Sequence, residues 1–344
     1  ININKEKNLE KIIVKEENTL GKIIISDKNI DIDFDETKNL VEDNMDAFHR
    51  ALEKDFGARH EQLSLLSDTM PVINNANHTL KNIRKWTKPE KRKPNFPLGL
   101  LGSKAYVQSQ PYGVVGIIAP WNFPLNLSLA PLVEIFAAGN NAMMKLSEFV
   151  PETSELIETL INKYFKSDEV RVVNGGPKTS QIFSGLAFDH LLFTGSTSVA
   201  KKIASEAATN LVPLTLELGG KSPVVISSEA KMKKSVDKII MGKLFNAGQI
   251  CIAPDYIFVP EDKEQDFVES ARVSVAEMYP TIKNNPDYTS IIHLNHYERL
   301  NSYIKDAKEK GAEIIQINPA HEDFDQQEHH KIPPTIILNV TDDM

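Results

Sequence analysis

The chain of 344 residues contains one cysteine, Cys251, within the segment GQICIAPDY at positions 248–256. A lone cysteine is most often a small apolar side chain that packs in the core. As a thiolate, the same side chain is a nucleophile that can form covalent intermediates. The residue type alone leaves both roles open, and the surrounding motifs must decide between them.

Two polar residues follow apolar runs that have the character of buried strands. Asn122 lies in IIAPWNFP (117–124), where its amide could stabilise an oxyanion; an Asx turn between prolines is the structural alternative. Glu217 lies in LTLELGG (214–220), and we expect it to be buried, which would favour a general base. A turn cap or an ion pair with Lys221 is the alternative for Glu217.

Two further strand ends have residues that suit a nucleotide. FTGST (193–197) leads into a helix start, where exposed N–H groups and the helix dipole favour a phosphate. An N-cap at the serine or threonine would explain the same residues. KLSE (145–148) places Lys145 and Glu148 where they could reach ribose hydroxyls, although a surface ion pair is the simpler explanation.

The motifs PWNFP, KLSE, FTGST, ELGGK and GQIC occur together in this order, and the chain resembles the NAD(P)-dependent aldehyde dehydrogenase superfamily. CIAPDY resembles the class 3 and coniferyl aldehyde dehydrogenase branch. The resemblance implies oxidation of an aromatic or otherwise hydrophobic aldehyde to the carboxylic acid. Cys251 would form a thiohemiacetal and then a thioester, Asn122 would hold the oxyanion, and Glu217 would activate water. An inactive cofactor-binding protein with the same fold is the alternative function.

The same resemblance implies NAD as the cofactor, with NADP as a second option, and a homodimer or higher homo-oligomer in the cytoplasm. Glu148 would repel a 2′-phosphate, which favours NAD. The motif departs from the family at Ala200, where a glycine is usual, and we expect its methyl group to crowd the cofactor. The implied cofactor contacts are Ile118, Trp121, Lys145, Glu148, Gly175, Gly195, Ser196 and Leu218.

Composition excludes several other classes of function. The net charge is −8, which gives no general attraction to a nucleic acid, and no apolar run is long enough to span a membrane. One cysteine cannot form an internal disulfide, which fits a reducing compartment. A cysteine hydrolase would need a base such as His190, but His190 lies at the start of a predicted strand, which argues against this function. We predict no metal site, because His293 with His296 and His329–His330 lack a recognisable ligand pattern.

The elements that must position these residues alternate between strands and helices. A helix is expected over 41–56 with its stop at Gly57, and a second over 63–83 with a kink at Pro71. Short apolar runs then alternate with helical segments, which predicts an α/β fold with a doubly wound parallel sheet. The expected strands are 112–120, 141–146, 170–174, 190–195 and 212–218, and the expected helices are 125–138, 151–165, 177–184 and 197–209.

A second strand–helix alternation from 224 onward predicts another α/β domain. We expect a cofactor-binding domain over 1–103 and 112–216, part of an oligomerisation arm over 104–111, and a catalytic domain over 217–344. The chain begins with Ile1 and ends before the family's EEIFGP-type motif and final strand, so we expect the catalytic domain to be incomplete.

Overall fold

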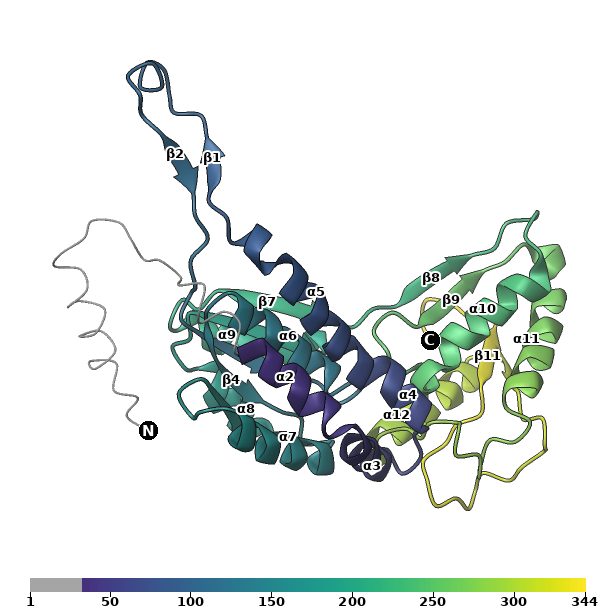
Figure 1. The fold of residues 1–344 in the computed structure, drawn as a ribbon. Coiled ribbons are helices and arrows are strands. Elements are labelled where there is room, and N and C mark those ends of the chain that lie inside the picture. Colours follow the sequence, from purple (N-terminus) through teal and green to yellow (C-terminus); the bar gives the residue numbers. More distant parts are fainter. Residues whose placement is uncertain (1–32) are drawn as a thin grey trace.

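The computed structural model describes residues 33–344, and a five-stranded parallel sheet lies in one of its two lobes, together with α6 to α9 (Figure 1). The strand order is β5-β4-β3-β6-β7, so β3 lies between β4 and β6 and the order reverses there. Parallel sheets bind ligands outside the carboxyl ends of the strands at such a point. The expected strands are confirmed as β3 (Val114–Ile118), β4 (Asn141–Lys145), β5 (Val170–Val173), β6 (His190–Gly195) and β7 (Leu214–Leu218).

Helices cover both faces of this sheet, as the doubly wound prediction requires. Ile117 packs in a cluster that includes residues of α6 and α7, whereas its neighbour Ile118 packs with residues of α8 and α9 on the opposite face. Successive side chains of a strand point to opposite faces, so both faces of β3 are buried. The helices are α6 (Asn126–Ala137), α7 (Pro151–Tyr164), α8 (Pro177–Ser184) and α9 (Thr197–Ala208).

The helices before the sheet differ in part from expectation. The predicted helix over 41–56 is divided at Asn44, which has φ −128° and ψ 18°, and the expected stop at Gly57 is confirmed by its φ of 75°. The kink at Pro71 stays a prediction: a π-helical turn directly precedes α5, and the proline lies in the first turn of α5. These elements are α2 (Asp33–Glu42), α3 (Met45–Phe56), α4 (Glu61–Ser64), the π turn η1 (Leu65–Thr69) and α5 (Met70–Trp86).

A hairpin projects from the body of the molecule beyond the end of α5 (Figure 1). It pairs β1 (Glu90–Arg92) with β2 (Ala105–Val107) in antiparallel register. Its tip exposes large apolar side chains, among them Phe96 at 86% and Leu100 at 79%. A surface of this kind on an extended arm is typical of an interaction site.

The remaining chain forms a second group of elements with its own hydrophobic core. β8 and β9 pair in parallel, and β10 and β11 pair antiparallel. Among residues 33–344, no helix is long and apolar enough to cross a membrane. The elements are β8 (Ser222–Val225), α10 (Met232–Leu244), η2 (Phe245–Gly248), β9 (Pro254–Phe258), η3 (Glu261–Lys263), α11 (Glu264–Met278), α12 (Leu294–Glu309), β10 (Glu313–Gln316) and β11 (Thr335–Leu338).

Candidate active site

The strand register places several predicted site residues at one edge of the sheet. Ile118, at the end of β3, lies opposite Lys145 at the end of β4. Gly195, at the end of β6, lies opposite Leu218 at the end of β7. Because all these strands are parallel, their carboxyl ends share one edge, and the loops that follow them surround the same crevice.

Cys251 is exposed and does not pack in the core. The short helix η2 immediately before it contains two consecutive residues in the left-handed region, Asn246 (φ 52°, ψ 34°) and Ala247 (φ 51°, ψ 34°). This conformation costs a residue other than glycine about 1–2 kcal/mol. The backbone strain turns the chain sharply between α10 and the loop that carries the thiol.

Contacts join the cysteine loop to the loops of Asn122 and Glu217. The Asn122 side-chain amide donates to the main-chain carbonyl of Gln249 at 3.1 Å, two residues before Cys251. Gly220, three residues after Glu217, lies so close that a Cβ there would stand 2.9 Å from the Cys251 carbonyl oxygen. The absence of a side chain at Gly220 therefore lets the two loops approach each other.

Gln249 braces the cysteine loop from the other side. Its Nε2 donates to the main-chain carbonyls of Asn246 at 3.1 Å and Ser290 at 2.9 Å. Its Oε1 accepts a hydrogen bond from the Ile292 backbone N–H at 3.0 Å. One side chain thus ties the loop to itself and to the segment that precedes α12.

Sequence reasoning missed a buried ion pair behind the Asn122 loop. Arg59 Nη2 lies 2.5 Å from Asp68 Oδ2, and both side chains are fully buried. Arg59 also donates to the Asn122 carbonyl at 2.8 Å, while Asp68 accepts from the backbone N–H groups of Leu125 and Asn126. Burial raises the pKa of Asp68, and the adjacent guanidinium opposes this rise. The sequence signal that could have indicated this pair is Asp68, a charged residue between Leu66 and Met70 of the apolar helical stripe.

The expected burial of Glu217 is wrong, because its side chain is exposed. The apolar run around it indicated a strand covered on both faces, but β7 is an edge strand of the sheet. The alternative ion pair with Lys221 is also wrong, since Lys221 Nζ lies 2.6 Å from Asp255 Oδ2. Glu217 is therefore an exposed carboxylate at the crevice edge of β7, where Thr194 lies opposite it.

Lys145 and Glu148 form an ion pair with an Nζ–Oε2 distance of 3.0 Å. It is not the surface pair that the sequence suggested, because the Lys145 side chain is only 2% exposed. Its Nζ also donates to the Leu146 carbonyl at 2.6 Å. The pair fixes the end of β4 and leaves Glu148 partly open to solvent at 30%.

The N-terminus of α9, at Ser196, is exposed, as an anion-binding helix terminus must be. Ser196 is the N-cap of α9, its hydroxyl accepts from the Val199 N–H at 3.4 Å, and the first turn is exposed. Ala200, whose methyl group we expected to crowd the cofactor, is 2% exposed and packs in the core cluster beneath α9. The backbone at the helix N-terminus remains accessible to a phosphate.

The other predicted cofactor contacts have different surroundings. Trp121 is partly buried; its ring centroid lies 6.4 Å from that of Phe56 and 5.3 Å from that of His296. Gly175 has φ +147°, and a Cβ there would meet the Thr179 hydroxyl at 2.3 Å. Leu218 packs at the edge of the cluster that contains Ile118. The contacts that the structure gives these residues are with other protein side chains.

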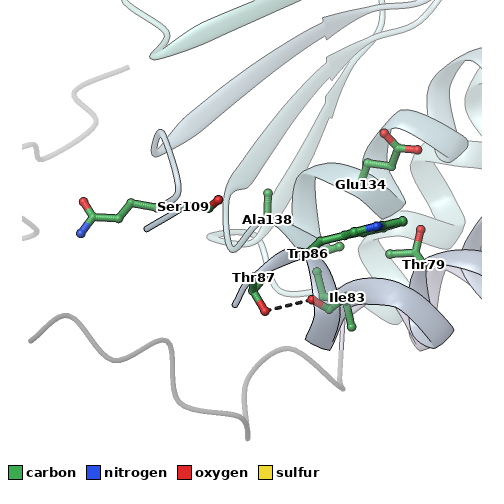
Figure 2. Close-up of a pocket in the computed structure, with 9 residues that line it drawn as sticks. Thr79, Ile83, Trp86, Thr87, Ser109, Glu134 and Ala138 are labelled. Atoms are coloured by element: carbon green, nitrogen blue, oxygen red, sulfur yellow. Dashed lines mark hydrogen bonds between the residues drawn. The ribbon is translucent and has the colours of Figure 1, made fainter. Parts of the chain in front are cut away.

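A separate cavity of about 290 Å³ lies at the base of the hairpin (Figure 2). Trp86 and Ile83 come from α5, and Glu134 comes from α6. The Thr87 hydroxyl beside it donates to the Ile83 carbonyl at 2.9 Å. None of the predicted site residues lines this cavity, so it is distinct from the crevice described above.

Comparison with known proteins agrees with the motifs. The aldehyde dehydrogenase family matches residues 34–344. A probable coniferyl aldehyde dehydrogenase of Caulobacter vibrioides is 53% identical over 296 residues, 86% of this chain and 61% of that protein. The coniferyl aldehyde dehydrogenase of Pseudomonas sp. strain HR199 is 47% identical over 302 residues, 88% of this chain and 62% of that protein.

The structural comparison also agrees. A solved structure described as the substrate-bound state of Staphylococcus aureus AldH has a TM-score of 0.85 at 32% sequence identity, covering 100% of this chain and 72% of that one. The chain spans about three fifths of the length of the two coniferyl aldehyde dehydrogenases above. Since the family match extends over almost all of the described residues, the chain belongs to the aldehyde dehydrogenase family.

Proposed function

We propose that the protein oxidises an aldehyde to a carboxylic acid, with Cys251 as the nucleophile. The observation that carries this proposal is the position of Cys251. It is exposed on a strained loop that contacts both the Asn122 amide and the backbone that follows Glu217. A packing role for the cysteine does not account for an exposed thiol in this position.

The thiolate adds to the aldehyde carbon, and the carbonyl oxygen becomes an oxyanion. An asparagine amide has two N–H groups; one from Asn122 is bound to Gln249, and the other is available to the oxyanion. The Cys251 backbone N–H would be the second donor, and each such donor contributes about 3 kcal/mol in the transition state. With a bound dinucleotide as the hydride acceptor, this adduct would become a thioester on Cys251. Glu217 takes a proton from water, whose oxygen attacks the thioester and releases the acid and the thiolate.

NAD would supply the hydride acceptor. The carboxyl ends of β3, β4 and β6 and the exposed N-terminus of α9 fit a dinucleotide, since the backbone N–H groups near Gly195 and Ser196 can bind its pyrophosphate. Lys145 and Glu148 would bind the adenine ribose, with Gly175 beside the adenosine. Ile118, Trp121 and Leu218 would border the rest of the cofactor. Glu148 disfavours a 2′-phosphate, so we propose NAD over NADP.

The substrate we propose is an aromatic aldehyde of the coniferyl type, since both relatives described above are named for it. The test is NADH formation by protein expressed from the complete gene, with coniferyl aldehyde and with a short aliphatic aldehyde. Turnover that disappears in Cys251→Ala, with NAD binding retained, is expected. Equal rates in parent and Cys251→Ala would reject the nucleophile. NAD binding without turnover by the parent would favour an inactive cofactor-binding protein.

We also propose that the hairpin acts in self-association in a cytoplasmic homo-oligomer. The support is its exposed apolar tip, which includes Phe96, Leu98, Leu100 and Leu101. The proposed arm would comprise the whole hairpin, residues 90–107, and not residues 104–111 alone. The rest of residues 1–103 with residues 112–216 would form the cofactor domain, and residues 217–344 would form the catalytic domain. Residues 1–32 lie outside the described part. Light scattering on Leu100→Asp and on the parent would test the arm, and equal masses would contradict its role.

A further inference from the structure

A group of ligand-forming side chains lies outside the crevice, at the junction of α3 and α4. His49 and Asp46 come from α3, three residues apart and therefore on one face of the helix. Glu61 is the first residue of α4. One potential ligand atom from each of these residues lies within 4.8 Å of the others.

His49 is the residue that sets this group apart from an ordinary acidic surface. Its side chain is 8% exposed, whereas Asp46 and Glu61 are exposed. Within residues 33–344, neither ring nitrogen of His49 has a hydrogen-bond partner. Its Nδ1 lies 3.5 Å from Glu61 Oε1, which is too long for a good hydrogen bond. Buried polar atoms without partners are uncommon and costly, so the imidazole requires an explanation.

Nδ1 is the His49 nitrogen that faces Glu61. In a neutral ring one nitrogen is a donor and the other an acceptor, and in the protonated ring both are donors. Within the described residues Nε2 has no partner whether Nδ1 carries a proton or a metal ion, so only Nδ1 bears on the choice. A metal ion on Nδ1 would use the lone pair of that nitrogen and the negative charge of both carboxylates.

We propose that Asp46, His49 and Glu61 bind a divalent transition metal of the zinc class. Imidazole nitrogen and carboxylate oxygen are both good zinc ligands, whereas calcium and magnesium prefer oxygen alone. Bonds of about 2.1 Å in a tetrahedron place ligand atoms about 3.4 Å apart. The observed 3.5 Å between His49 Nδ1 and Glu61 Oε1 matches that spacing. The exposed Asp46 side chain supplies the third ligand, and water completes the shell.

An ion in this position would clamp the loop that carries Arg59. α3 ends at Phe56, with Gly57 as its C-cap, and α4 begins at Glu61, so the ligands lie on either side of the turn. Within that turn, Ala58 accepts a backbone hydrogen bond from Ser290 at 3.0 Å, and Arg59 reaches the Asn122 carbonyl. The metal would thus stabilise the folded state by joining two helices, at a site separate from the proposed chemistry.

The test is calorimetric titration of the protein with ZnCl₂ after removal of any affinity tag and dialysis against a chelator. The background is Cys251→Ala, because the exposed thiol would itself bind zinc. We expect one equivalent of zinc with a dissociation constant of about 10 µM or tighter, and a higher melting temperature when it is bound. His49→Gln and Glu61→Gln should each weaken binding by at least about tenfold.

Two histidine variants serve as matched controls. His78 is exposed on α5, and His330 is one of two consecutive histidines, His329 and His330. His78→Gln and His330→Gln should bind zinc as the parent does. Since Glu61 is exposed, Glu61→Gln keeps the test decisive even if His49→Gln fails to fold. Unchanged affinity in Glu61→Gln, loss of binding in His330→Gln, or no binding by the parent would overturn the proposal.

Discussion

Arg59 donates a hydrogen bond to the main-chain carbonyl of Asn122 at 2.8 Å while its other terminal nitrogen pairs with Asp68. Arg59 thus joins the buried Arg59–Asp68 ion pair to the loop whose Asn122 amide we propose as the oxyanion donor. Asp68 anchors the same loop a second time, through the N–H groups of Leu125 and Asn126 at the start of α6. The position of the Asn122 amide therefore depends on two residues that never face the crevice.

Removing one partner of the Arg59–Asp68 pair should be strongly destabilising. Asp68→Asn leaves the guanidinium buried without a counter-charge, and we expect the free energy of unfolding to fall by about 3–5 kcal/mol. The double variant Arg59→Met/Asp68→Leu should recover a large part of that loss, because apolar side chains of similar volume need no counter-charge. Urea denaturation of the three proteins measures both effects. A double variant no more stable than Asp68→Asn would contradict this account.

Gln249→Leu should disturb the cysteine loop. It leaves the Ile292 N–H and the Ser290 carbonyl without the partner that the amide supplies, which costs about 1–3 kcal/mol of stability. Because Gln249 positions Cys251 without touching substrate, kcat should fall more than KM changes. Steady-state kinetics and urea unfolding measure the two effects. The control is Gln265→Leu, on the exposed face of α11, which should behave as the parent does. An unchanged kcat in Gln249→Leu would refute the positioning role.

Glu217→Gln should separate the two halves of the proposed reaction. Without the carboxylate, thioester hydrolysis slows by about 10²–10⁴-fold, while addition of Cys251 to the aldehyde continues. We expect a first turnover of NADH in a rapid burst followed by slow steady-state formation. Stopped-flow absorbance detects this pattern, and Glu229→Gln provides a surface control. A slow first turnover would place Glu217 before the thioester instead.

The local parts of this structure were predictable, and the long-range parts were not. Helix α8 matches its expected bounds, because Pro177 sits in its first turn and Gly185 follows its last residue. The motif residues converge because parallel strands must share an edge. The Arg59–Asn122 contact instead joins residues 63 positions apart, and no periodic pattern encodes such a pairing. The exposure of Glu217 depends on which strand is at the edge, which an apolar run cannot reveal.

The last prediction concerns acid stability and depends on His296. Burial, with smaller contributions from the neighbouring His293 and Arg299, lowers the pKa of His296 from 6.5 to about 4. The arrangement requires a neutral ring, since Arg299 Nη2 can only donate and lies 2.9 Å from His296 Nδ1. The Trp121 and Phe149 rings that pack against it are uncharged and supply no counter-ion.

The sign of the effect follows from proton uptake. Between pH 6.5 and about 4 the unfolded chain binds a proton at His296 that the folded chain does not, so stability falls as the pH is lowered through this range. The full shift corresponds to about 3 kcal/mol, but the ring is partly exposed and solvent screening reduces this to about 1 kcal/mol. His293 has a pKa lowered mainly by burial and acts in the same direction. Urea unfolding at pH 7 and pH 5 should therefore show a smaller loss of stability in His296→Gln than in the parent or in His78→Gln. An equal loss in all three proteins would show that His296 titrates normally in the folded state.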